Sequence, residues 1–339
     1  MNFRIHLSKI SIALCLVLIS LSGYVLYYER KIEHLTKWFE DSIKLQERNK
    51  PVNNLTYPAF KHPLAPPYPF PYKFIINQPD KCRNRKPFLV IMILGECYDS
   101  ASRHTIRETW GNESLYDVDV VKIFLVGQSR FFQDRVQDLL EEESDIFEDI
   151  IQQDFIDTYY NLTLKTLMGM EWVIKFCPSA SYVIKIDNDM FLNVDSLVHQ
   201  LLNPDLPVRQ NYFTGTIVSN TGPLRDNGYK WYVPKEVYPN NTYPPYCAGP
   251  GYVFSIDMAK KIYDVAQEIR VIPMEDAFMG ICLYELHIPP TEPPRDKFHG
   301  HRINYDRCHF KNVITVHHYA GSELRSIWAD FQGNKSVNC

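Results

Sequence analysis

The stretch SYVIKIDND, residues 181 to 189, runs from an apolar, β-branched segment into a turn that carries two aspartates. Its first part has the composition of a buried strand, and Asp and Asn favour the turn that follows. In open α/β sheets, ligands bind beyond the carboxyl ends of the strands. Carboxylates at positions i and i+2 of such a turn can face one point in space. The stretch therefore predicts an α/β sheet with a ligand site at its edge.

The alternation of strands and helices continues toward the N-terminus. Residues 88–94 (FLVIMIL) form a continuous apolar run, as in a strand buried on both faces. Further strands are expected at 118–126 and 149–154, and helical periodicity appears at 131–143 and 162–176. This pattern predicts an α/β domain with a mostly parallel central sheet flanked by helices.

The two aspartates of the turn, Asp187 and Asp189, are candidate metal ligands. Hard divalent cations take carboxylate oxygens and keep positions open for substrate phosphates. A metal at this place could bridge a diphosphate and neutralise the charge that builds as it leaves. The alternative is a solvated turn, because Asp and Asn are favoured in turns anyway. His317 and His318 follow a short apolar strand; one of them could add a nitrogen ligand, and alone each would be an ordinary packed or surface histidine.

A second acidic pair, Glu275 and Asp276, opens the expected helix EDAFMGICLYEL. A hydroxyl group is a poor nucleophile at neutral pH, so a carboxylate must take its proton as attack proceeds. The pair is thus a candidate general base. The alternative is a pair of charges that complements the helix dipole.

Basic residues in two other segments are candidate partners of a diphosphate. Arg and Lys pair well with phosphate oxygens, and Arg103, Arg107 and Lys165 lie in polar or helical segments next to predicted strands. The alternative for each is a surface charge. The formal net charge of −4 argues against nucleic acid as a partner.

The N-terminus predicts a membrane anchor. Residues 10–28 carry no charge and approach the length of about 20 residues that spans a hydrocarbon core. The alternative is a cleaved signal peptide, but the run exceeds a typical apolar region of about 7–15 residues and no small-x-small site follows. We expect a cytoplasmic tail at 1–9, the anchor at 10–28, a Pro- and Tyr-rich stem at 29–86 and a lumenal catalytic domain at 87–339.

Sequons and cysteines agree with a lumenal body. Five N-x-S/T sequons follow the expected anchor, and their acceptors are Asn54, Asn112, Asn161, Asn240 and Asn334. Of the 8 cysteines only Cys15 lies in the span. A lumenal chain would oxidise most of the rest, and their odd number predicts one unpaired thiol. No C-x-x-C occurs, which argues against a zinc ribbon.

The chain resembles the β-1,3-galactosyltransferases of glycosyltransferase family 31 from about Cys82 to Cys339. Blocks typical of that family follow one another in its order: RHTIRETWG (103–111), DIIQQDFIDTYYNLTLKTLMGMEW (149–172), KIDNDMFLNVD (185–195), YPPYCAGPGYVFS (243–255) and EDAFMGICL (275–283).

The resemblance implies a GT-A fold on a type II Golgi membrane anchor, with Mn²⁺ as cofactor and UDP-galactose as donor. It implies that Asp187, Asp189 and His317 hold the metal and that Asp276 is the base of an inverting reaction. The residues expected at the donor are Arg103, Arg107, Lys165, Asp187, Asn188 and Glu275. The acceptor would be the 3-hydroxyl of a terminal N-acetylhexosamine or galactose on a glycoprotein or glycolipid. A homodimer is compatible with the sequence.

Two alternatives stay open. Asn188 and Cys247 are typical of the galactosyl members, whereas Pro250 stands where those members often have Thr. UDP-N-acetylglucosamine is therefore the alternative donor. An alternative of another class is a non-catalytic Golgi binding or chaperone protein. Such a protein would be expected to lose its acidic positions, and all four are present here.

Overall fold

The structure, a computed structural model, describes residues 64–333. The predicted tail, the predicted anchor, most of the predicted stem and the sequons at Asn54 and Asn334 lie outside these residues. Within 64–333, none of the helices has the length and apolar character needed to cross a bilayer.

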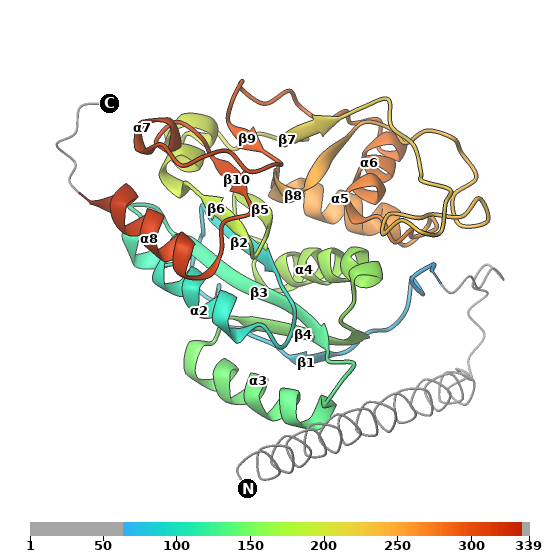
Figure 1. Cartoon of the computed structure of the whole chain (residues 1–339), viewed down its shortest axis with the longest axis horizontal. Coiled ribbons are helices and arrows are strands. Elements are labelled where there is room, and N and C mark those ends of the chain that lie inside the picture. Colours follow the sequence, from blue (N-terminus) through green and yellow to red (C-terminus); the bar gives the residue numbers. More distant parts are fainter. Residues whose placement is uncertain (1–63, 334–339) are drawn as a thin grey trace, which may run out of the picture. The chain divides into compact units, whose positions relative to one another are not determined.

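A seven-stranded sheet forms the centre of the described fold (Figure 1). Its strand order is β1-β4-β3-β2-β5-β8-β7. The strands are β1 (Phe74–Ile76), β2 (Leu89–Leu94), β3 (Val120–Gln128), β4 (Ile150–Ile156), β5 (Tyr182–Asp187), β7 (Phe213–Val218) and β8 (Tyr246–Ser255).

This sheet is mixed. β4, β3, β2 and β5 run parallel to one another, whereas β1, β8 and β7 pair antiparallel with their neighbours. The mostly parallel sheet expected from the sequence is therefore correct for the four central strands and wrong for the edges. β1 lies within the segment predicted as stem, and pairs with β4. That part of the predicted stem thus forms an edge strand.

Helices cover both faces of the sheet (Figure 1). Along β2, Val90 and Met92 belong to one apolar cluster, and Leu89 and Ile91 belong to the other, as strand alternation requires. The first cluster is completed by α4 (Leu162–Phe176), α5 (Ile256–Ala266) and α6 (Glu275–Glu285). The second is completed by α2 (Ser100–Glu108), α3 (Gln133–Phe147) and α8 (Gly321–Gln332). The helices expected at 131–143 and 162–176 are confirmed.

A smaller sheet has the order β6-β10-β9. β10 (Thr315–His317) pairs antiparallel with β6 (Met190–Leu192) and parallel with β9 (Phe298–His299). β6 follows the acidic turn directly, so this sheet brings a C-terminal strand beside it. The remaining elements are α7 (Arg307–Phe310) and the short helical turns η1 (Glu113–Leu115), η2 (Tyr159–Asn161) and η3 (Ser196–Leu202).

A disulfide joins Cys82, which precedes β2, to Cys177 at the end of α4. Cys97, Cys247 and Cys282 are free and buried. The prediction of a single unpaired thiol is therefore wrong, because each of these three sulfurs is packed in the interior.

Candidate active site

The acidic turn lies at the carboxyl edge of the parallel strands. β5 ends at Asp187, and the backbone N–H of Asn188 donates to the carbonyl of Leu94 at the end of β2, at 3.0 Å. The backbone N–H of Tyr319 donates to the Asp189 carbonyl at 2.9 Å. The turn is thus held by β2 on one side and by the C-terminal segment on the other. The predicted position of both aspartates at a strand end is confirmed.

Two histidines meet Asp189. The register of β10 on β6 sets His317 opposite Met190, the neighbour of Asp189. Asp189 Oδ2 lies 3.3 Å from His317 Nε2 and 3.6 Å from His318 Nδ1, and the two rings stack at 3.7 Å between centroids. The three ligand atoms of this group all lie within 4.8 Å of one another. The sequence favours one histidine, whereas the structure brings both to the carboxylate.

The protonation of His317 follows from its second contact. Its Nδ1 lies 3.1 Å from the carbonyl oxygen of Gly300, which can only accept a hydrogen bond. Nδ1 therefore carries the hydrogen, and Nε2 is directed to Asp189. This is the arrangement by which proteins orient an imidazole that binds a metal.

Lys185 contacts Asp187 and was missed by the sequence analysis. Its ammonium donates to Asp187 Oδ1 at 2.6 Å and to the carbonyl of Gly249 at 2.5 Å, and lies 3.7 Å from Glu275 Oε2. The Lys185 side chain is only 2% exposed. A lysine in an otherwise apolar strand, two residues before Asp187 and thus on the same face, is the signal that could have identified it.

Glu275 is a buried anchor. Its Oε1 accepts from the Tyr252 hydroxyl at 2.5 Å and from Thr166 Oγ1 at 3.0 Å, while Oε2 faces Lys185. Burial raises the pKa of Glu275, and Lys185 opposes that rise. With its oxygens occupied by side chains from α4, β5 and β8, this carboxyl group fixes the position of Lys185.

Asp276 is held by backbone groups. Its Oδ2 accepts from the N–H of Gly249 at 3.1 Å, and its Oδ1 accepts from the N–H of Ala277 at 2.8 Å. It lies in the first turn of α6. Burial raises the pKa of Asp276 above the ordinary value of 3.8, although these backbone hydrogen bonds oppose the rise. A carboxylate with a raised pKa is a better proton acceptor than an ordinary surface aspartate.

Aromatic side chains lie within electrostatic range of Asp276. Burial, together with the nearby Asp276 charge, raises the pKa of Tyr159 to about 12, and Tyr159 is hydrogen-bonded to Trp231. Lys230 lies 3.9 Å from the centre of the Tyr159 ring. Trp231 is 54% exposed, so part of its indole is available to a ligand.

Lys165 and Asn188 lie at the same strand edge but are engaged within the protein. The Lys165 ammonium donates to Asp157 Oδ1 at 2.6 Å and to the Gly95 carbonyl at 2.5 Å. Asn188 Nδ2 donates to Asp99 Oδ2 at 2.9 Å. A Cβ at Gly95 would lie 3.1 Å from Asn188 Nδ2, so the two groups are close.

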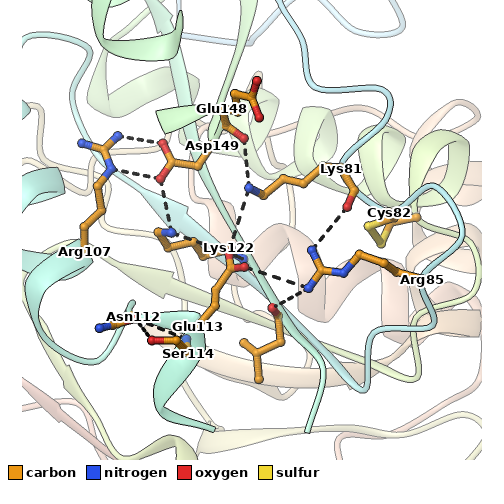
Figure 2. A network of polar contacts seen from close by, with 12 residues as sticks. Lys81, Cys82, Arg85, Arg107, Asn112, Glu113, Ser114, Lys122, Glu148 and Asp149 are labelled. Carbon is orange, nitrogen blue, oxygen red and sulfur yellow. Dashed lines mark hydrogen bonds and ion pairs between the residues drawn. A yellow bond between two sulfur atoms is a disulfide. The ribbon is translucent and has the colours of Figure 1, made fainter. Parts of the chain in front are cut away.

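Arg107 is not brought to the aspartates of the turn. Figure 2 shows its guanidinium bound to Asp149, which also contacts Lys122 at 3.4 Å. Arg107 donates to Asp149 at 2.7 and 2.9 Å and to Glu143 at 2.7 Å, and lies 3.9 Å from the Phe147 ring centre. Asp149 precedes β4, so this network lies toward the amino end of that strand.

Arg103 lies between the two regions. It forms a two-point ion pair with Glu143 at 2.8 and 2.6 Å and donates to the carbonyl of Glu96, just beyond β2, at 3.1 Å. The Arg103 side chain is buried. Its donors are therefore used by the protein.

The chain belongs to the Galactosyltransferase family, because the model of that family matches residues 101–294. Beta-1,3-galactosyltransferase 2 of Mus musculus is 45% identical over 275 residues, 80% of this chain and 65% of the relative. The Homo sapiens protein of that name is 46% identical over the same shares. Beta-1,3-galactosyltransferase 1 of Mus musculus is 43% identical over 272 residues, 80% of this chain and 82% of the relative.

The chain thus spans 65% of the length of the first two relatives. A solved apo structure of the bifunctional glycosyltransferase WbbM aligns with 70% of this chain and 46% of its own, at 10% identity and a TM-score of 0.36. That structural similarity is too low to support a conclusion.

Proposed function

We propose that the protein is a β-1,3-galactosyltransferase that moves galactose from UDP-galactose to the 3-hydroxyl of a terminal sugar on a glycan. The names of its relatives support the reaction class. The observation that carries the proposal is the group of Asp189, His317 and His318 at the strand edge, with Asp187 in the same turn and Asp276 held at Gly249. The mixed sheet with this turn after β5 supports a GT-A fold.

The acidic turn fits a divalent cation such as Mn²⁺. Carboxylate oxygens and imidazole nitrogens are both ligands of first-row divalent metals. One oxygen of Asp189 faces two imidazoles and no lysine or arginine within ion-pair distance in the described chain. Asp189, His317 and His318, with Asp187, would hold the ion, which when bound supplies positive charge against the diphosphate.

The neighbouring protein groups prepare this site. Lys185 fixes one oxygen of Asp187, and the Gly300 carbonyl fixes the His317 ring. Glu275 in turn fixes Lys185. Preorganised groups of this kind do not have to reorganise when charge develops on the leaving UDP.

We assign the general base to Asp276. It would accept the proton of the acceptor hydroxyl while that oxygen attacks the anomeric carbon and UDP leaves from the opposite face, which inverts the configuration. Two backbone N–H groups hold the carboxylate in place during this step. Trp231 and Tyr159 offer apolar faces for the acceptor sugar at the same place.

The other predicted donor residues act through the protein. Lys165, Asn188 and Glu275 stabilise the carboxyl edge of the sheet, because their polar atoms form hydrogen bonds with other protein groups. Arg103 and Arg107 belong to the ion network around Glu143. We therefore leave both arginines out of the donor contacts.

We also propose a type II Golgi membrane protein with a lumenal catalytic domain. The Cys82–Cys177 disulfide supports an oxidising compartment. Asn240 is exposed and could accept a glycan. The predicted anchor at 10–28 is part of this proposal.

The test uses the full-length protein purified in detergent. UDP release is measured with Mn²⁺, a panel of UDP-sugars and glycosides of N-acetylhexosamine and galactose, with and without EDTA. We expect EDTA-sensitive transfer from UDP-galactose. Turnover of UDP-N-acetylglucosamine instead would overturn the donor assignment, and folded protein inactive with every donor would overturn the reaction.

A matched pair of variants tests the metal assignment. Asp189→Asn should abolish Mn²⁺-dependent transfer. Asp117→Asn should not, because Asp117 pairs only with His199, at 3.0 Å, on the exposed surface. Equal activity of the two variants would contradict the assignment.

A further inference from the structure

A second group of metal-binding side chains lies outside the acidic turn. Asp296, His299 and His309 each offer a ligand atom, and these atoms all lie within 4.8 Å of one another. Asp296 Oδ2 lies 2.7 Å from His309 Nε2, and Asp296 Oδ1 lies 3.2 Å from His299 Nε2. His299 ends β9, and His309 lies in α7, so the group joins two separate elements.

His299 carries a polar atom that the described protein leaves unsatisfied. Its side chain is only 10% exposed. Its Nε2 is buried and makes no hydrogen bond to any group within residues 64–333, although it lies 3.2 Å from Asp296 Oδ1. An unsatisfied buried polar group costs about 1–3 kcal/mol, so such atoms call for an explanation.

We propose that Asp296, His299 and His309 bind a divalent transition-metal ion of the zinc class. Two imidazoles and one carboxylate are a recurrent zinc ligand set, with a fourth position left to solvent. Zinc ligands at their usual bond lengths stand about 3.3 Å apart in a tetrahedral site. The separation of 3.2 Å between Asp296 Oδ1 and His299 Nε2 is close to that value, and the separation of 2.7 Å between Asp296 Oδ2 and His309 Nε2 is shorter. Asp296 is 63% exposed, which gives an ion access from solvent.

This ion would act on the strand that supports His317. Val316 pairs with His299 in the β10–β9 ladder, and Gly300, the next residue, holds His317 Nδ1. Binding at His299 would therefore fix the Gly300 carbonyl. The ligands are distinct from Asp189, His317 and His318, so the ion is additional to the one in the acidic turn.

The test measures zinc on the full-length protein in detergent. The parent protein in this test carries Asp189→Asn, which removes the carboxylate of the first group, and every further variant is made in this parent. After EDTA treatment and dialysis, Zn²⁺ affinity and stoichiometry are measured by equilibrium dialysis and elemental analysis. We expect one tightly bound Zn²⁺ per chain, weakened about 10–100-fold or more by His309→Gln or Asp296→Asn. His199→Gln, which removes an exposed histidine paired with Asp117, should leave affinity unchanged.

Thermal unfolding separates loss of the site from loss of the fold. Zinc should raise the unfolding temperature of the parent and of His199→Gln, but not of the two ligand variants, because only the folded site binds the ion. The ligand side chains are 38% and 63% exposed, so the metal-free variants should unfold near the parent temperature. The proposal is overturned if folded parent protein binds no zinc, or if both ligand variants bind it as the parent does.

Discussion

Two clusters of charged side chains in this protein have opposite balances of charge. Around Asp149, in the region of Figure 2, lysines and arginines from several segments meet the carboxylates of Glu113, Asp119, Glu143 and Asp149. Around the acidic turn, Lys185 faces Asp187 and Glu275. Within residues 64–333, the ion-pair partners of Asp189 are two histidines, and the hydrogen-bond donors to Asp276 are backbone N–H groups.

The difference distinguishes a structural network from a binding site. In the network each carboxylate has an arginine or lysine partner, so no further cation is needed. At the turn, acidic groups exceed the lysine, and a divalent cation would restore the balance. A cation bound to carboxylates is therefore a prediction for the turn and not for the network.

The largest expected effect is on catalysis. Asp276→Asn should lower kcat by about 10²–10⁴-fold, because general-base catalysis contributes that much. UDP affinity, measured by calorimetry, should stay unchanged. Asp264→Asn, which alters an exposed carboxylate paired with Lys260, is the control. Near wild-type turnover of the Asp276 variant would show that the base is another group.

Two substitutions, each of which removes one positively charged side chain, compare the network around Asp149 with the acidic turn. Lys185→Met should cost about 3–5 kcal/mol of unfolding free energy, because it leaves the buried Glu275 carboxylate without the lysine that faces it. Arg107→Met should cost less, because Asp149 keeps Lys122 and Glu143 keeps Arg103. At a temperature where both are folded, Arg107→Met should keep wild-type UDP affinity and Lys185→Met should lose it. Urea unfolding and calorimetry measure the two effects. Loss of UDP affinity in both variants would mean that the network belongs to the donor site.

The clusters should also respond differently to acid. Burial raises the pKa of Asp276 above 3.8, so kcat should fall at a pH above that value as the base becomes protonated. At Glu143 burial favours a higher pKa, but Arg103 and Arg107 outweigh burial and lower the pKa of this carboxyl group below 4.5. The stability that Glu143 contributes is therefore present above pH 4.5 and lost as pH falls through the lowered pKa. A pH–rate profile and acid unfolding should show activity lost before this stability; the reverse order would contradict the comparison.

The smallest expected effect concerns the exposed indole. Trp231→Ala should raise the acceptor KM roughly 2- to 12-fold, which corresponds to the 0.5–1.5 kcal/mol of an aromatic contact, with donor KM unchanged. The control is Trp328→Phe, in a helix on the second face of the sheet. A change in donor KM alone would place Trp231 at the nucleotide instead.

The sequence predicts the strands that local pattern determines. Residues 88–94 are a continuous apolar run, and residues 182–186 are apolar except for Lys185; both segments form central strands. β1 and β9, at 3 and 2 residues, are too short to show periodicity and exist only through their pairing partners. β8, which pairs antiparallel with β5 and with β7, was not predicted, because glycine and proline are unfavourable inside a strand.

The site was predictable where residues are close in sequence and less so elsewhere. Asp187 and Asp189 lie two residues apart in one turn, so the sequence alone predicts that they are close in space. That His318 joins His317 depends on its left-handed backbone, with φ of 64°, which the sequence does not reveal. Whether Arg107 faces a phosphate or Asp149 depends on long-range packing, because both partners suit a guanidinium equally.

The pairing of β10 with β6 has a consequence for synthesis of the protein. A ribosome makes Asp187 and Asp189 long before it makes His317, and the small sheet forms only when both strands are available. The nascent chain would therefore carry an incomplete form of the proposed metal site while residues 190 to 316 are being synthesised. Completion of the C-terminal strand would act as a late assembly step, so that chains truncated before it would not acquire activity.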